Sequence, residues 1–427
     1  MNKGTRLQWV IVVAAFCLLH LLFFTRVFYS GGPDVDGYYQ YAVKMDKGQV
    51  AYRDFSVEYP PGALVVFYLP YLASHNLAGY GTAFTFEMLF FDVIGLLFVL
   101  GLGKKAGISP WTSLIGYTLA MVAIGSIMIQ RFDMVPAVIT LGAVYAFSRG
   151  NYKIAWAILA LGTMTKLYPA LLAPLFLIYQ WRRGGLRSAI PSMATFAVAT
   201  LLIAAPLLAL NSHGFISSFT VQSQRPLQLE STYSSLLLLG NSLGLISAQP
   251  VQGPISLNID SSLAGPLARY SFIFMGLGLL TVYGLYYRNC LKLAKAAAPF
   301  APEGPALADF LNYSFIAIVV LLVTSKVFSP QYMVWLYPLF PLVSGRFRAA
   351  IWIVFLAASC LTWYIYPLHY YDLIDTQQSA VDALILRDTL VIFIAVLLLG
   401  EKVPARAVDG NANNARLELS TACRKEG

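Results

Sequence analysis

Long apolar runs with very few charged residues recur along this chain from Leu7 to Gly400. A helix needs about 20 apolar residues to cross the hydrocarbon core of a bilayer, and we relax that length for runs between short turns. Because 58% of the residues are hydrophobic and 11% are charged, a soluble core cannot enclose the apolar surface. The sequence therefore predicts an all-α polytopic membrane protein with about twelve transmembrane helices, at Leu7–Phe24, Ala83–Gly103, Pro110–Ile129, Met134–Ser148, Ile154–Thr165, Leu167–Trp181, Ser188–Leu210, Pro266–Tyr287, Ala308–Thr324, Tyr332–Ser344, Ala349–Trp363 and Leu384–Gly400.

The basic residues predict how the chain is oriented in a plasma (inner) membrane. Lys and Arg accumulate in short cytoplasmic loops, and alternate connections hold most of the basic residues while the others hold most of the acids. We therefore expect both termini to be cytoplasmic, and the net charge of +9 indicates topology, not nucleic-acid binding. No small-residue cleavage site follows Leu7–Phe24, so we expect a retained span. Residues 1–402 are predicted to form the membrane domain and residues 403–427 a disordered cytoplasmic tail.

Two long connections fall on the predicted outer face, at residues 25–82 and 211–265. Two apolar pieces within them, Gly62–Ala73 and Leu236–Ile246, are too short to span and are predicted to be re-entrant or surface helices. The first connection combines several carboxylates with tyrosines beside the bilayer. Such a surface can hold a polar group while amphipathic rings stay among the lipid headgroups. We expect chemistry in this connection.

Four cations interrupt the outer-face segments, namely Arg131, Lys166, Arg225 and Lys326. A cation at that depth is costly, so each needs an anionic partner or a wet cavity. The four cysteines show no CxxC or Cys/His spacing, which gives no support for a disulfide framework or a zinc site.

Six segments of the outer face together resemble a known family. They read DVDGYYQY from Asp34, YRDFSVEYPPG from Tyr52, RFD from Arg131, KLYP from Lys166, QRPLQLES from Gln224 and KVFSPQYMVW from Lys326. In this order they resemble the GT-C glycosyltransferases that use polyprenyl-phosphate sugars, most closely the family 87 type with its mannosyltransferases. The resemblance runs from Asp34 to about Pro338.

The resemblance implies an inverting hexosyltransferase that works at the extracytoplasmic membrane face. Its donor would be a polyprenyl-phosphate sugar, with mannose as the expected sugar, and its acceptor a lipid or glycan hydroxyl. By motif position Asp36 looks like the catalytic carboxylate, and Asp34 looks like the other half of a DxD pair. Asp34 would either orient the site or bind a divalent cation together with Asp36, and no cofactor is otherwise implied. The alternative for this pair is an Asx-turn at a helix start.

The remaining site residues are expected to hold the donor and acceptor. Cations would offset the charge that develops on the leaving phosphate, and the candidates for this role are Arg225, Lys326, Lys166 and His213. Candidates for binding the rest of the substrate are Glu58, Arg131, Asp133 and Glu230. Structural alternatives stay open: Arg131 as an ion-pair partner of Asp133 or Asp92, and Glu58 as a helix cap.

Two other classes of protein fit parts of the sequence. A lipid-linked sugar flippase or secondary transporter also has many spans with intramembrane charge, but it typically shows repeated halves and charges near the midplane. A non-catalytic envelope scaffold gives no reason for the acids of the first connection. Within the spans, Asp92 is expected to pair with another helix, and His20 to be a satisfied core histidine.

Overall fold

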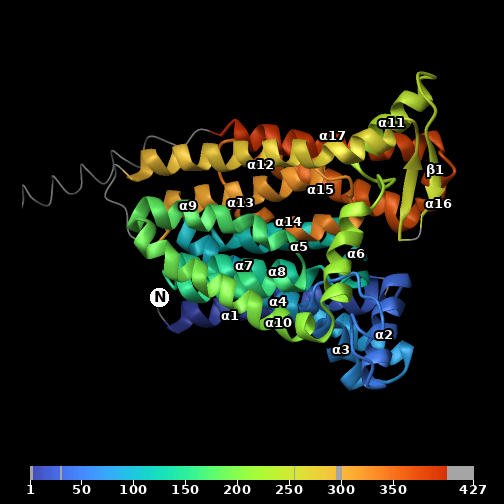
Figure 1. The fold of residues 1–427 in the computed structure, drawn as a ribbon. Helices are drawn as coiled ribbons and strands as arrows, with labels where there is room; N and C mark the ends of the chain where they lie inside the picture. Colours follow the sequence, from blue (N-terminus) through green and yellow to red (C-terminus); the bar gives the residue numbers. More distant parts are fainter. Residues whose placement is uncertain (1–2, 29–30, 254, 295–300, 402–427) are drawn as a thin grey trace, which may run out of the picture.

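The computed structural model describes residues 3–28, 31–253, 255–294 and 301–401. It is an all-α polytopic membrane protein in which long helices run side by side (Figure 1). The tail predicted at residues 403–427 lies outside the described residues.

Six helices within the described residues are long and apolar enough to cross a membrane. They are α1 (Lys3–Leu22) with its extension η1 (Phe23–Val27), α4 (Leu77–Ala106), α10 (Leu186–Gln224), α12 (Ala264–Ala294), α13 (Gly304–Thr324), and α15 (Arg348–Trp363) with its extension η5 (Tyr364–Leu368).

Further helices complete the bundle. They are α5 (Pro110–Ile124), α6 (Ile127–Gln130), α7 (Met134–Ser148), α8 (Tyr152–Thr165), η2 (Tyr168–Leu172), α9 (Ala173–Gly184), η3 (Pro330–Tyr332), α14 (Met333–Leu336), η4 (Phe340–Leu342) and α17 (Gln378–Leu399). All twelve predicted spans are thus helical, but Tyr332–Ser344 is broken into short turns. Pro338 and Pro341 cause the breaks because proline cannot donate to the preceding turn.

The predicted outer connections gather at one end of the bundle, which we call the outer end (right in Figure 1). Its elements are α2 (Pro33–Asp46), α3 (Pro61–Ala73), α11 (Thr232–Ser242), β1 (Gln249–Gln252), β2 (Leu257–Asp260) and α16 (Tyr370–Ile374). The two short pieces expected to be surface helices are α3 and α11. The antiparallel hairpin β1–β2, in which Gln249 lies opposite Asp260, was not predicted. The start of α1 and the end of α17 lie at the opposite end of the bundle.

A kink in α10 joins this span to the first outer connection. Asn211 leaves helical geometry, with φ −158° and ψ 90°. Its Nδ2 atom donates to the backbone oxygen of Tyr52 at 3.2 Å, and its Oδ1 atom accepts from the N–H of Gly214 at 2.9 Å. The side chain of Asn211 thus replaces backbone pairing lost at the kink.

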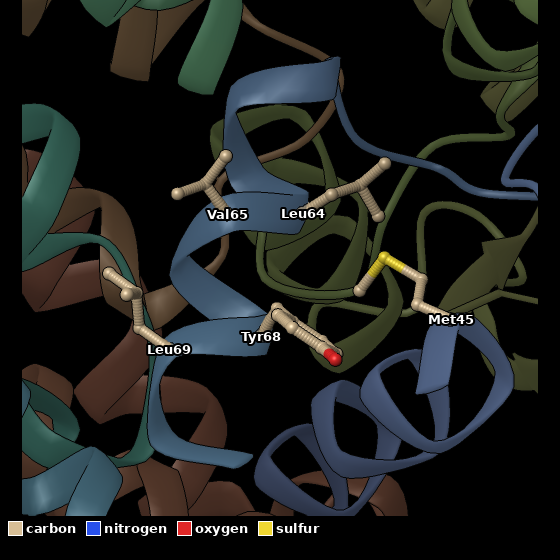
Figure 2. Close-up of a pocket in the computed structure, with 5 residues that line it drawn as sticks. All are labelled: Met45, Leu64, Val65, Tyr68 and Leu69. Carbon is tan, nitrogen blue, oxygen red and sulfur yellow. The ribbon is translucent and has the colours of Figure 1, made fainter. Parts of the chain in front are cut away.

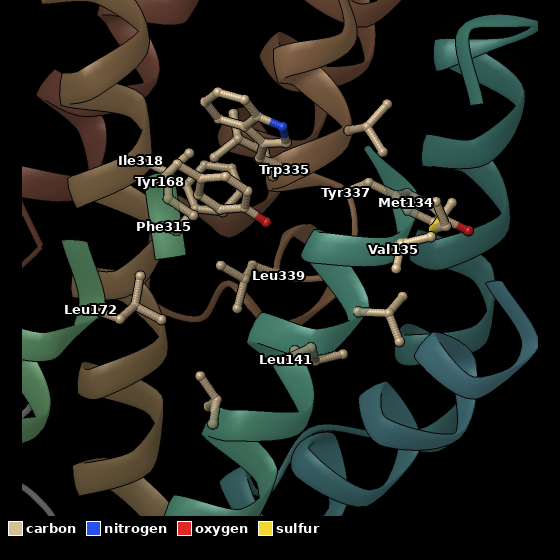
Figure 3. Close-up of a cluster of buried hydrophobic side chains, with 14 of the residues drawn as sticks. Met134, Val135, Leu141, Tyr168, Leu172, Phe315, Ile318, Trp335, Tyr337 and Leu339 are labelled. Carbon is tan, nitrogen blue, oxygen red and sulfur yellow. The ribbon is translucent and has the colours of Figure 1, made fainter. Parts of the chain in front are cut away.

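Two hydrophobic clusters hold the bundle. The larger one includes the rings of Tyr168 and Trp335 above Leu141 and Leu339, where α7, η2, α13 and α14 meet (Figure 3). The smaller one packs the segment before α11 against α17, through residues such as Leu229. The smaller cluster lies at the outer end and therefore fixes the connections that carry the candidate site.

Candidate functional site

Asp34 and Arg131 form an ion pair that joins two outer-end segments. Pro33 opens α2, so Asp34 lies in its first turn, where a carboxylate is favoured by the helix dipole. Arg131 pairs with Asp34, not with Asp133 or Asp92. Its Nη2 atom also donates to the hydroxyl of Tyr366 at 3.0 Å. The side chain of Asp34 is 30% exposed, so the pair remains accessible.

Asp36 lies on a different side of α2. An α-helix turns about 100° per residue, so residues two apart point in nearly opposite directions. Asp36 is exposed, whereas Asp34 faces Arg131. The DxD pair therefore cannot chelate one cation with both side chains, and among the described residues no three His, Cys, Asp or Glu side chains gather as metal ligands.

Asp133 and Lys166 form a second ion pair, which is almost buried. The Nζ atom of Lys166 lies 2.5 Å from Oδ1 of Asp133, and Nε1 of Trp335 donates to the same oxygen at 2.5 Å. Lys166 also lies 4.7 Å from the ring centroid of Phe132. The charges of Arg131 and Arg225 both act on Lys166, which connects this pair with its neighbours.

Aromatic rings form a continuous stack beside Lys166. Tyr168 lies parallel to Trp335, with 4.2 Å between the ring centroids, and the ring centroids of Tyr332 and Trp335 are 3.9 Å apart. This arrangement makes one wall of the site rigid, because each ring restricts the rotation of the next.

Arg225 and Lys326, which we call the cation pair, lie close enough for their charges to interact. Burial lowers the pKa of Lys326, and the positive charge of Arg225 lowers it further. Burial raises the pKa of Glu58, an effect that nearby Arg225 opposes. Nζ of Lys326 donates to the backbone oxygen of Ser223 at 2.6 Å. Two cations within electrostatic reach of each other in a partly buried place attract an anion.

His213 is exposed on α10, and no contact among the described residues joins it to the cation pair. The structure therefore brings together Arg225 and Lys326 with Glu58 nearby, but it does not add His213 to that group.

Glu230 is buried in the loop that follows Arg225. It is 3% exposed, and Nε2 of Gln228 donates to its Oε2 at 3.2 Å. Burial raises the pKa of Glu230 to about 7, although the charges of Arg387 and Arg131 oppose this shift. Glu230 thus lies within electrostatic reach of the Asp34–Arg131 pair.

Arg387 was not identified from the sequence. It is fully buried on α17, next to Asp388, and its Nη2 atom donates to the backbone oxygen of Glu230 at 2.6 Å. The sequence did carry a signal, because adjacent opposite charges inside a mostly apolar helix are uncommon and mark a candidate site.

Asp92 and His20 have the structural role that was predicted. The Nδ1 atom of His20 lies 2.5 Å from Oδ2 of Asp92, and Thr118 lies 2.9 Å from the other ring nitrogen. Tyr337 donates to Oδ1 of Asp92 at 2.8 Å. These contacts join α1, α4, α5 and the segment after α14 inside the bundle, and they confirm both predictions.

A shallow apolar groove lies between α2 and α3 (Figure 2). It encloses about 310 Å³ and is lined by Met45, Leu64, Val65, Tyr68 and Leu69. The charged residues described above do not line it.

Neither a protein-family model nor a curated protein sequence matches this chain. Its fold is similar to the crystal structure of ArnT from Cupriavidus metallidurans bound to undecaprenyl phosphate, with a TM-score of 0.50 and 14% sequence identity. That match covers 92% of this chain and 77% of ArnT. A structure of ArnT from the same organism in the apo state gives a TM-score of 0.49 at 13% identity, over 93% and 77% of the two chains. The match to the ligand-bound structure shows that this chain shares the overall polytopic helical fold of ArnT.

Proposed function

We propose that this chain is an integral membrane glycosyltransferase that moves a sugar from a polyprenyl-phosphate donor to a hydroxyl of a lipid or glycan acceptor. One observation carries the proposal: an accessible carboxylate, Asp34, lies in the same outer-end site as the cation pair. Lys166 links the two parts, since the charges of Arg131 and Arg225 both act on it. A carboxylate can accept the acceptor's proton, and cations can offset charge on a leaving phosphate.

The similarity of folds supports the class of donor. ArnT was crystallised with undecaprenyl phosphate, and its fold resembles that of this chain over 92% of the chain. Because a shared fold does not by itself fix an activity, the charged residues have to support the same ligand. The cation pair does so, because two cations within electrostatic reach of each other can together offset the negative charge of a phosphate monoester.

The geometry favours Asp34 over Asp36 as the general base. Asp34 faces the interior of the site and is oriented by Arg131, whereas Asp36 is exposed on another side of α2. A base must lie within hydrogen-bonding reach of the proton that it accepts. The prediction made for Asp36 from motif position remains, and the two residues are distinguished by the variants described below.

The proposed reaction is one displacement at the anomeric carbon of the sugar. The acceptor oxygen forms a bond to this carbon while the bond from the carbon to the phosphate oxygen breaks. Asp34 takes the hydroxyl proton, and polyprenyl phosphate leaves with the electron pair. The cation pair receives the added negative charge on the phosphate. A single displacement inverts the configuration at the anomeric carbon.

Mannose as the sugar and membership of the family 87 type rest on the sequence resemblance alone. We also propose that the outer end faces the extracytoplasmic side of the plasma membrane, which the distribution of basic residues supports. No step of the reaction requires a metal ion bound by Asp34 and Asp36.

Product analysis tests the proposed function. Purified protein is incubated with polyprenyl-phosphate mannose and a panel of lipid and glycan acceptors, and the products are identified by mass. We expect an acceptor heavier by one hexose together with free polyprenyl phosphate. Transfer of the intact lipid-linked sugar across vesicles, without a new glycosidic bond, would instead support a flippase or transporter.

A further inference from the structure

Arg387 is a buried charge in the mostly apolar helix α17. It is 1% exposed, and its neighbour Asp388 is 2% exposed. Burying a guanidinium and a carboxylate costs free energy that their attraction does not reliably return. A contribution to stability is therefore a weak explanation for Arg387.

The guanidinium of Arg387 contacts both loops that carry the cation pair. We call residues 224–231 the Arg225 loop and residues 325–332 the Lys326 loop. Nη2 of Arg387 donates to the backbone oxygen of Glu230, in the Arg225 loop, at 2.6 Å. The guanidinium carbon lies 3.9 Å from the ring centroid of Phe328, in the Lys326 loop.

Gln228 fastens the same two loops to each other. Its backbone N–H donates to the oxygen of Lys326 at 3.0 Å. Its side-chain oxygen accepts from the N–H of Phe328 at 2.8 Å, and its Nε2 atom donates to the hydroxyl of Ser329 at 3.0 Å. The two loops therefore form one unit, which Arg387 attaches to α17.

We infer that Arg387 is a positioning residue that sets the spacing of Arg225 and Lys326 for the donor phosphate. The inference rests on the proposed function. Arg387 acts through the two loops and not on the phosphate itself, since its guanidinium is occupied by Glu230, Phe328 and Asp388, whose Oδ1 lies 2.8 Å from Nε.

The contacts require an arginine and not only a positive charge. A planar guanidinium stacks on an aromatic ring with its face and donates hydrogen bonds in fixed directions from its edge. A lysine in this position retains the charge beside Asp388, but one ammonium group cannot reproduce the stacking and the directed hydrogen bond together. Arg387→Lys therefore separates positioning from charge.

The test measures binding of undecaprenyl phosphate and turnover in Arg387→Lys and in Phe328→Leu. The second variant removes the ring from beneath the guanidinium and leaves every charge in place. We expect both to bind undecaprenyl phosphate about tenfold more weakly, as for a lost charge-assisted contact, and KM for the donor to rise more than kcat falls. Gln180→Leu is the control for general destabilisation, because Gln180 accepts from Trp156 at 2.6 Å inside the bundle, on α9 at the end opposite the site.

A double-mutant cycle with Arg225→Gln gives the decisive readout. If Arg387 acts by positioning the cation pair, Arg387→Lys weakens binding much less when Arg225 is already lost. Additive losses of binding in the double-mutant cycle would overturn the inference. An equal loss of binding in Gln180→Leu, at the melting temperature of Arg387→Lys, would overturn it as well. Failure of the wild-type protein to bind undecaprenyl phosphate would overturn the proposed function instead. If Arg387→Lys does not fold, the same cycle with Phe328→Leu in its place tests the inference.

Discussion

Asp34, in the first turn of α2, is paired with Arg131, in the turn before α7, while Asp36 two positions further along α2 is exposed to solvent. The pair therefore distinguishes two carboxylates that the sequence presents as one motif. It also joins the first outer connection to the turn that holds Asp133, which is paired with Lys166.

The first prediction compares Asp34→Asn with Asp36→Asn. An amide keeps the shape of the side chain but cannot accept the acceptor's proton, and loss of a general base costs about 10²–10⁴ in rate. We expect Asp34→Asn to lose turnover on this scale and Asp36→Asn to keep most of it. Initial rates at equal amounts of folded protein in membranes measure the difference. The reverse order would return the assignment to Asp36.

The second prediction concerns the cation pair. Replacing Arg225 or Lys326 with Gln removes a charge-assisted contact worth about 1.5–3 kcal/mol. We expect turnover to fall and inhibition by free polyprenyl phosphate to weaken in parallel, with little change in melting temperature. Variants that melt early and still bind polyprenyl phosphate normally would remove these residues from the donor site.

The third prediction separates Lys166 from the cation pair. Lys166 holds the carboxylate of Asp133, which is 1% exposed, so Lys166→Gln leaves a buried charge without its partner. Breaking such a pair typically costs about 3–5 kcal/mol of stability. We expect Lys166→Gln to melt well below the wild type, and Lys166→Gln with Asp133→Asn to recover part of the loss. Normal melting with lost phosphate binding would place Lys166 in the donor site.

The fourth prediction uses the titration of Glu230. Burial raises its pKa from 4.5 to about 7 in the folded protein. Between these values the folded protein holds a proton that the unfolded chain has released, so the free energy of unfolding falls as pH rises through this window. Glu230→Gln lacks this titration. We expect the melting temperature of Glu230→Gln minus that of the wild type to increase from pH 5 to pH 8. A constant difference across this range would show that Glu230 does not titrate there.

The fifth prediction concerns orientation. In a variant without native cysteines, Lys47→Cys at the end of α2 is expected to react with an impermeant thiol reagent on intact cells. Arg149→Cys, exposed after α7, is expected to react only after permeabilisation. Lys47 is used in preference to Gly48, whose φ of +77° disfavours any side chain. Labelling of Arg149→Cys on intact cells would reverse the assigned sides.

The helices could be predicted because long apolar runs leave a chain few alternatives in a bilayer. The hairpin β1–β2 could not, since four-residue strands are too short to show a reliable alternation. Asp92 was predicted to pair with another helix because an isolated carboxylate inside a span is so costly.

Partners at the site were harder to predict than the site residues themselves. Arg131 and Asp133 are neighbours in sequence, yet they pair with Asp34 and Lys166 respectively. Which carboxylate pairs with which cation depends on how distant segments pack together. The spacing of residues along the sequence does not reveal that packing. Arg387 was missed because the apolar run around it dominated the interpretation of α17.

The hydrogen bond from Asn211 to Tyr52 limits how α10 can change in length. Deleting one residue of α10 before Asn211 would rotate that side chain by about 100° and draw it about 1.5 Å along the helix axis. Asn211 would then face away from Tyr52, and the first outer connection would lose this attachment. Substitutions along the lipid-facing side of α10 leave the rotation unchanged. Insertions and deletions in this helix are therefore far less tolerable than changes of side chain.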